Sequence, residues 1–182
     1  MAKLISITYG EALFELAVEE QKLDVLFEEA KAVREILREN AEFGKLMTHP
    51  KISKEEKVKV AEQVFKGRTS KEMTGFLVII IEKGRFEEVD AVLTYFIDKV
   101  KEEKQIGVAF VTTAVALDEA TQTKIVKRLL ETTGYESMEM HYSVDPSIIG
   151  GMIIRIGDRV IDSSITTKLN ELKKQLMKIQ LG

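Results

Sequence analysis

The chain has 182 residues and a formal net charge of -3, with 45% hydrophobic and 31% charged residues. These proportions are those of a globular protein with a buried core, and they exclude a disordered chain, a fibrous repeat and a strongly basic nucleic-acid-binding domain. The absence of cysteine excludes disulfides, thiolate metal sites and cysteine nucleophiles.

The first half of the chain has the apolar spacing of amphipathic helices. Between residues 5 and 37, apolar side chains recur every three or four positions in two stripes, which predicts two helices that pair as a hairpin. A short third helix around Phe43 is predicted to end at His49, because Pro50 disfavours helix at the residue before it.

Two more helices are predicted to begin at capping boxes, in which a hydroxyl group and a carboxylate three residues later satisfy backbone N–H groups. The first box is Ser53 with Glu56, and the second is Thr69 with Glu72. The second helix contains the run GFLVIII, which is apolar on every side, so we expect it in the middle of a bundle. This run is far shorter than the roughly 20 residues of a spanning helix, so no membrane insertion is expected.

A change of pattern divides the chain into two predicted domains. A sixth helix with a strict apolar seam covers residues 86–100, and the polar stretch KVKEEKQIG (99–107) ends the helical periodicity. We therefore expect an α+β protein, with a six-helix bundle at residues 1–104 and a small mixed α/β domain at residues 105–182.

The second domain is predicted to begin with a strand, a helix and another strand. Residues 108–113 alternate between two apolar sets, which favours a strand covered on both faces. Asp118 is expected to cap a helix that Gly134 terminates. Residues 138–144 alternate between apolar and polar side chains, the pattern of a strand with one solvent-facing side.

The stretch GGMIIRIGDRVIDSSI, residues 150–165, predicts a hairpin that leads into a helix. Residues 152–156 form the first strand, and the turn is Gly157-Asp158, where Gly157 supplies the positive φ that a two-residue turn requires. The return strand ends at Asp162.

The last helix combines an apolar seam with a basic surface. Its cap is expected among Asp162, Ser163 and Ser164. The seam steps by three and four through Ile165, Leu169, Leu172, Leu176 and Ile179. The basic residues are Lys168, Lys173, Lys174 and Lys178, against a single Glu171. These cations either complement the helix dipole or let the helix dock an acidic helix or an anionic membrane surface.

The residue types that usually carry catalysis are sparse. Of the two histidines, His49 adjoins a proline and His141 lies on the polar side of a strand, and neither has metal-ligand spacing. Gly150-Gly151 invites comparison with a phosphate-binding loop, but no nucleotide-binding glycine motif surrounds it, which favours a bend or a close backbone approach.

Three aspartates raise the alternative of a carboxylate or Mg²⁺ site. Each has a competing structural role, because Asp145 precedes a Pro-Ser turn, Asp158 lies in the hairpin and Asp162 precedes the last helix. We therefore predict no catalytic residue, no metal and no cofactor. A nucleic-acid or membrane-surface adaptor acting through the basic last helix remains an alternative.

Three stretches resemble the delta subunit family of F-type ATP synthases, which includes the mitochondrial oligomycin-sensitivity-conferring protein. They are VDPSIIGGMIIRIGDRVIDSSITTKLNELKKQL, TYGEALFELAVEE and, less specifically, LMTHPKISKEEK with FLVIIIEKGRFEEV. The resemblance spans essentially the whole chain in the family's order. Two residues depart from the pattern: Gly10 stands where alanine is usual, and Ser163 where glycine is common.

The resemblance implies a non-catalytic stator subunit, present in one copy per complex at the cytoplasmic face of a bacterial membrane. It implies that the helical domain binds N-terminal segments of the alpha subunits, that the second domain binds the ends of the b-type stalk, and that the link resists rotor torque during proton-driven ATP synthesis. No nucleic-acid partner is expected.

The resemblance also assigns candidate site residues. The alpha-subunit groove would lie between the first and fifth helices and involve Tyr9, Ala12, Leu13, Leu16, Phe76, Ile79 and Ile80. The candidate stalk contacts are Leu169, Leu172, Lys173 and Leu176. The signature residues, expected to be structural, are Asp145, Gly150, Gly151, Arg155, Gly157, Asp158 and Asp162.

Overall fold

The computed structural model describes residues 2–180, with side chains from residue 4 to residue 177. The chain forms two compact units, Met1–Lys101 and Glu102–Gly182, and its fold class is that predicted from the sequence, a helical part followed by a smaller α/β part.

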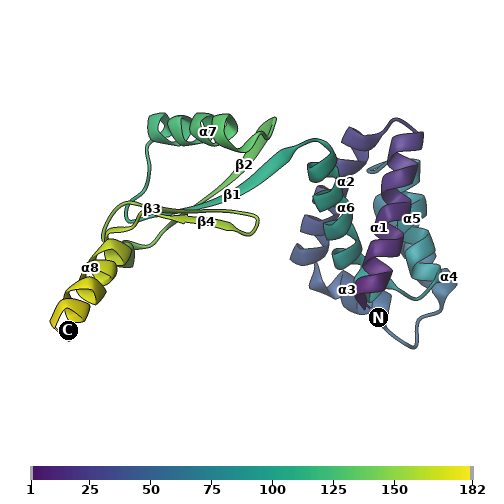
Figure 1. Cartoon of the computed structure of the whole chain (residues 1–182). Coiled ribbons are helices and arrows are strands. Elements are labelled where there is room, and N and C mark those ends of the chain that lie inside the picture. The colour runs from purple at the N-terminus through teal and green to yellow at the C-terminus, as the bar shows by residue number, and fades with distance from the viewer. Residues whose placement is uncertain (1, 181–182) are drawn as a thin grey trace. The chain divides into compact units, whose positions relative to one another are not determined.

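From residue 2 onward, where the structure describes it, the first unit is a bundle of six α-helices with one short 3-10 turn (Figure 1). Its elements are α1 (Ala2–Glu19), α2 (Leu23–Glu39), α3 (Ala41–Thr48), α4 (Lys54–Phe65), α5 (Lys71–Glu82), η1 (Phe86–Glu88) and α6 (Val89–Glu103). The predicted seam of the sixth helix is buried along its length, from Phe86 to Val100. The largest fully buried side chains of the bundle include Leu26, Leu77 and Phe96, so α2, α5 and α6 all contribute to the core.

The expectation that α5 lies in the middle of the bundle is wrong. Met73, Leu77 and Ile80 are buried, but Ile79 is 49% exposed. The helix therefore buries one side in the core and leaves Ile79 on an apolar side that faces solvent.

The two predicted capping boxes differ in outcome. Ser53 and Glu56 form a complete box at the start of α4. At α5 the cap is Ser70 rather than Thr69, and the Ser70 hydroxyl accepts from the Met73 N–H at 3.2 Å. The Ser70 N–H and hydroxyl both donate to the Glu29 carboxylate of α2, each at 2.7 Å. A partner from another helix thus selects the cap, which local spacing does not show.

Gly10 is explained by its packing against α6. A Cβ at this position would lie 2.4 Å from a ring carbon of Tyr95, so only glycine lets the ring approach α1. The Tyr95 hydroxyl then donates to Glu11 at 2.5 Å, and Lys99 pairs with the same carboxylate. Glycine at this position therefore lowers the helix propensity of α1, but it allows α1 and α6 to pack closely.

We expect Gly10→Ala to destabilise the protein by about 1–3 kcal/mol, because overpacking outweighs the gain in helix propensity. Urea unfolding of the full chain measures the change. Gly44→Ala is the matched control, since a Cβ there has nothing within 4 Å and should raise stability by up to about 1 kcal/mol. If Gly10→Ala lowers stability as much in a Tyr95→Ala background, the ring is not the cause.

The described part of the second unit, up to residue 180, is a four-stranded mixed sheet with two α-helices. Its elements are β1 (Ile106–Thr113), α7 (Glu119–Thr133), β2 (Ser137–Val144), η2 (Pro146–Ile148), β3 (Met152–Ile156), β4 (Arg159–Asp162) and α8 (Ile165–Gln180). The strand order is β2-β1-β3-β4, with β1 and β2 parallel and the other pairs antiparallel. As predicted, Asp118 caps α7, and Gly134, with a φ of +75°, ends it.

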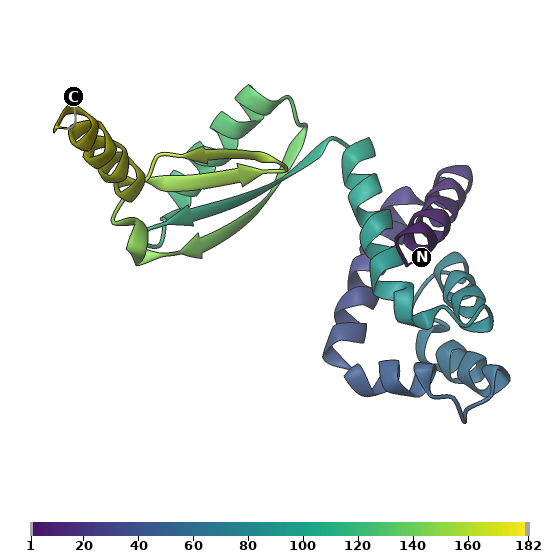
Figure 2. The same cartoon turned by 60° about the horizontal axis from the view of Figure 1, so that its bottom comes forward.

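The expectation that β1 is covered on both faces is wrong. Figure 2 shows α7 against one face of the sheet, where Ala109 and Val111 are fully buried beneath it. On the opposite face Phe110 is 42% exposed and stacks on the His141 ring at a centroid distance of 4.9 Å. The Arg155 guanidinium lies 4.8 Å from the centroid of the same Phe110 ring. Stacking with polar residues therefore replaces the second helix layer that the apolar alternation indicated.

The junction between β4 and α8 is held by side-chain hydrogen bonds. Ser164 is the cap, since its hydroxyl accepts from the Thr167 N–H at 3.2 Å. Asp162 instead accepts from the Ser164 N–H and the Thr167 hydroxyl, each at 2.8 Å. Hydrogen bonding by Ser164, and secondarily by Thr167, holds the pKa of Asp162 below its ordinary value.

This lowered pKa makes the junction sensitive to acid. A carboxylate with a depressed folded-state pKa contributes stability that is present above its unfolded-state pKa, about 4, and is lost as the pH falls through the folded-state value. We expect Asp162→Asn to lower the unfolding midpoint near neutral pH, and the difference from the parent chain to shrink as the pH falls below about 4. Thermal melts across this range test it, and a pH-independent difference would contradict the role assigned to the charge.

Candidate functional site

An apolar groove of about 550 Å³ lies between α1 and α5. Its lining consists of Tyr9, Ala12, Leu13, Leu16, Lys71, Glu72, Gly75, Phe76 and Ile79. The two helices supply opposite walls, since residues at i, i+3, i+4 and i+7 of a helix share one side. The chain thereby presents an elongated apolar surface bordered by two helices.

Most residues predicted for the groove lie together, but they contribute differently. Leu13 and Phe76 are only 1% and 7% exposed, so they form its floor and also belong to the core. Ala12 and Ile79 are exposed and present their side chains to the groove. Ile80 is fully buried and does not line it, because its side of α5 faces the core.

Three lining residues were not predicted: Lys71, Glu72 and Gly75. Gly75 is unusual in the sequence, because a glycine inside a helix lowers the stability of the helix by about 1 kcal/mol relative to alanine. Packing does not require it, since a Cβ at Gly75 would meet nothing within 4 Å. Because Gly75 has no side chain, α5 leaves open space in the groove at this position.

Charged residues at the rim fix the start of α5. Lys22, which precedes α2, donates to Glu72 at 2.7 Å. This hydrogen bond lowers the pKa of Glu72 and raises the pKa of Lys22, so both remain charged near neutral pH. Together with the Glu29 contact to Ser70, it ties the first turn of α5 to the α2 side of the bundle.

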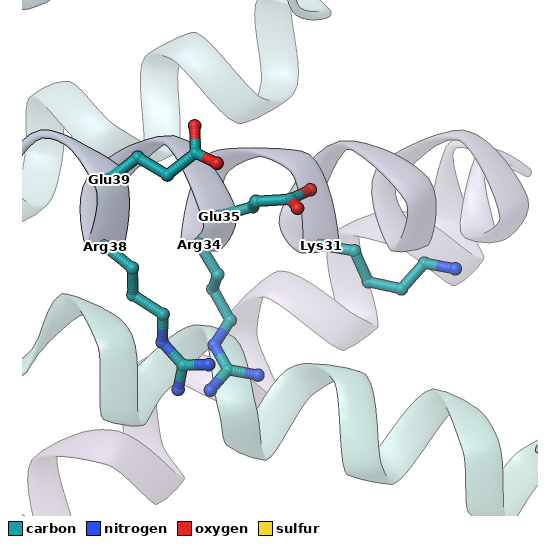
Figure 3. Close-up of a pocket in the computed structure, with 5 residues that line it drawn as sticks. All are labelled: Lys31, Arg34, Glu35, Arg38 and Glu39. Carbon is teal, nitrogen blue, oxygen red and sulfur yellow. The ribbon is translucent and has the colours of Figure 1, made fainter. Parts of the chain in front are cut away.

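A second hollow, on α2, is charged throughout (Figure 3). It is lined by Lys31, Arg34, Glu35, Arg38 and Glu39. Figure 3 shows the Arg34 and Arg38 guanidinium groups side by side, with Glu35 and Glu39 pointing away from them. Both arginines contact Asp90 of α6, at 2.9 Å and 3.5 Å. Burial raises the pKa of Asp90, but the two guanidinium groups outweigh it and keep the pKa low. The cluster therefore links α2 to α6.

The signature residues of the second unit hold the backbone around the hairpin. Gly157 has a φ of +55° in the turn between β3 and β4, as predicted. Gly151 has a φ of +77°, and a Cβ there would lie 2.4 Å from the Ser163 carbonyl oxygen. Asp145 accepts from the Ser147 N–H at 2.9 Å, and hydrogen bonding by Ser147 lowers its pKa. Gly151 thus permits a close approach of two backbones, whereas a Cβ at Gly150 would meet the Ile165 side chain at 2.8 Å.

The candidate stalk residues lie on an uncovered stripe of α8. Leu169, Leu172 and Leu176 are 53%, 51% and 56% exposed, and Lys173 beside them is exposed. The side chain of Ile179, also predicted for the seam, lies outside the described residues. The described part of α8 therefore presents its apolar seam to solvent.

The two histidines, the remaining candidates for catalysis or metal binding, lie in different units of the chain. His49 follows α3 and His141 is on the exposed sheet face, where it contacts Glu139 at 2.9 Å. Among the described residues, no three His, Asp or Glu side chains are arranged to hold a metal ion. No described helix is both long and apolar enough to cross a membrane.

Comparison with known proteins gives one family throughout. The family described as ATP synthase delta (OSCP) subunit matches residues 5–176. ATP synthase subunit delta of Lachnoclostridium phytofermentans is 58% identical over 182 residues, covering 100% of both chains. The same subunit of Alkaliphilus oremlandii is 35% identical, covering 98% of this chain and 99% of the relative. A chain in the cryo-EM structure of the Toxoplasma gondii mitochondrial ATP synthase hexamer shares the fold, with a TM-score of 0.74, 22% identity and coverage of 94% and 97%.

Proposed function

Because the chain belongs to the ATP synthase delta (OSCP) subunit family and is therefore a non-catalytic peripheral-stalk subunit, we propose that its α1–α5 groove receives an amphipathic helix from the N-terminal segment of an alpha subunit. The alternative of a nucleic-acid or membrane-surface adaptor gains no support from the relatives, which are ATP synthase subunits.

The apolar groove is the observation that carries the proposal. A helix that docks through residues at i, i+3, i+4 and i+7 needs a long apolar trough with polar borders. Leu13 and Phe76 supply an apolar floor that the core holds in place, and Lys71 and Glu72 supply the border. Gly75 leaves room for a partner's backbone or a bulky side chain, since its own helix makes no use of the space.

The second unit is proposed to bind the ends of the b-type stalk through α8 and the adjoining hairpin. Leu169 and Leu172 are exposed apolar residues on one stripe of a helix, the arrangement that pairs with another helix. Two binding surfaces in one chain connect the catalytic head to the stalk and oppose rotation of the head. Such a subunit acts as a single copy at the cytoplasmic face of the bacterial membrane, without entering it.

Calorimetric titration of the full-length chain tests both halves of the proposal. One ligand is a peptide of the alpha subunit's N-terminal segment from the same organism, and the other is the C-terminal segment of the b-type subunit. We expect each to bind 1:1, with affinities unchanged when the other is already bound. Failure of the folded chain to bind the alpha peptide would contradict the groove assignment, and failure to bind the stalk segment would contradict the role of α8.

A further inference from the structure

Ile149 adopts a backbone conformation that strains a β-branched residue. Its φ is +67° and its ψ is -41°, and the Gly150 N–H donates across it to the Ile148 carbonyl at 2.8 Å. This is a γ-turn of the form with positive φ, which is rare and strained. For a β-branched residue a positive φ is a true outlier, and glycine would adopt it at far lower cost.

The strain does not serve the core of the unit. Ile148 is 6% exposed and fills the interior, whereas Ile149 is 62% exposed. Because most of the Ile149 side chain faces solvent, its packing does not compensate for the free energy of the strained backbone. Strained residues of this kind concentrate at functional sites, where another molecule makes use of the conformation.

Ile149 lies beside the start of α8. The Thr166 hydroxyl donates to the Ser147 carbonyl and the Ile165 N–H donates to the Gly150 carbonyl, each at 2.9 Å. The residues on either side of Ile149 are therefore bonded to the first turn of α8. Ile165 is 42% exposed, so the exposed apolar seam of α8 begins next to the turn that presents Ile149.

The charges that border the seam indicate the chemistry of its partner. Lys168 precedes Leu169 and Lys173 follows Leu172, and both lysines are exposed. They hold the positions that flank the seam of a coiled coil, where opposite charges on the partner set the pairing. An α-helix whose apolar stripe is flanked by glutamate or aspartate complements this arrangement.

We propose that Ile149 and the first half of the α8 seam form one docking surface, in which Ile149 anchors a stalk helix with acidic flanks. This inference rests on the proposed binding of the stalk by the second unit, and it adds an anchor outside α8 together with the charge of the partner. The few side chains that become fully buried at the centre of an interface carry most of its binding free energy, so loss of the Ile149 side chain should weaken binding measurably.

The test compares Ile149→Gly with Gln105→Gly in the full-length chain, using the b-type C-terminal segment as the probe. Gln105 is the matched control, because it also has a positive φ, of +51°, within the same unit. We expect Ile149→Gly to raise the melting temperature by about 2–4 °C through relief of strain. We also expect it to weaken stalk binding at least about tenfold. Gln105→Gly should leave the affinity unchanged.

A charge-reversed variant, Lys168→Glu with Lys173→Glu, tests the partner's chemistry and should weaken binding mainly at low salt. Unchanged affinity in Ile149→Gly, with a parent chain that binds the segment, would overturn the anchor while leaving stalk binding intact. A parent chain that does not bind the segment would overturn both. Binding instead to anionic phosphatidylglycerol vesicles, lost in Ile149→Gly, would assign the surface to lipid and overturn the helix partner.

Discussion

Replacing Gly75 with tryptophan is expected to abolish binding of the alpha-subunit segment while leaving the fold intact. A Cβ at Gly75 meets open space, so the indole would occupy the groove rather than displace the core. Leaving glycine also raises the helix propensity of α5. We expect the affinity measured by calorimetry to fall at least about 100-fold, equivalent to about 2.7 kcal/mol.

The matched control for this variant is Gly44→Trp. Gly44 is also a glycine within a helix, α3, where a Cβ would meet nothing within 4 Å, but it does not line the groove. Its binding of the alpha segment should equal that of the parent chain. Leu13→Asp is a poorer test, because Leu13 is 1% exposed and its replacement by a charge would unfold the bundle. Undiminished binding by folded Gly75→Trp would show that the segment docks elsewhere.

Gly151→Ala is expected to destabilise the second unit by about 3 kcal/mol or more. The φ of +77° costs an L-residue about 1–2 kcal/mol. The remainder arises because the new Cβ would lie 2.4 Å from the Ser163 carbonyl oxygen, a backbone atom that cannot move without displacing the start of α8. The Ser163 N–H and hydroxyl both donate to the Met152 carbonyl at 2.9 Å, so the shift would also disturb the start of β3.

Gly134→Ala separates the two contributions. Gly134 has a φ of +75°, close to that of Gly151, but a Cβ there has nothing within 4 Å. It should therefore show only the conformational cost, about 1–2 kcal/mol. Urea unfolding gives the free energies, and hydrogen exchange at β3 and α8 locates the loss. Equal destabilisation by the two substitutions would mean that the contact with Ser163 relaxes at little cost.

Local rules predicted the elements whose ends are set by neighbouring residues. Ser53 and Glu56 form a box within four residues, and Gly157 forms a two-residue turn, so sequence spacing determines both. At α5 the rule selected Thr69, whereas the actual cap is Ser70. The Glu29 carboxylate decides this from 41 residues away, and no local pattern contains that information.

The groove illustrates a different limit of sequence analysis. Periodicity places Leu13, Phe76, Ile79 and Ile80 among apolar residues, but it does not say which side of α5 another helix covers. The resemblance to a family supplied the pairing of the first and fifth helices. The structure shows that two consecutive residues of α5 have opposite environments, since Ile80 is fully buried in the core and Ile79 is 49% exposed. Gly10 is a departure from the family pattern that the sequence alone does not explain, because its contact with Tyr95 joins residues 85 positions apart.

The ties between the α2 side of the bundle and the first turn of α5 have a kinetic consequence. Glu29 accepts hydrogen bonds from Ser70, and Lys22 forms an ion pair with Glu72. These contacts fix the start of α5, and neither Glu29 nor Lys22 lines the groove. The floor is equally fixed, since Leu13 and Phe76 are core residues. A site formed in advance needs no opening step before its ligand enters. Association of the alpha segment should therefore be a single phase whose observed rate rises linearly with peptide concentration, without the plateau that a slow opening reaction imposes.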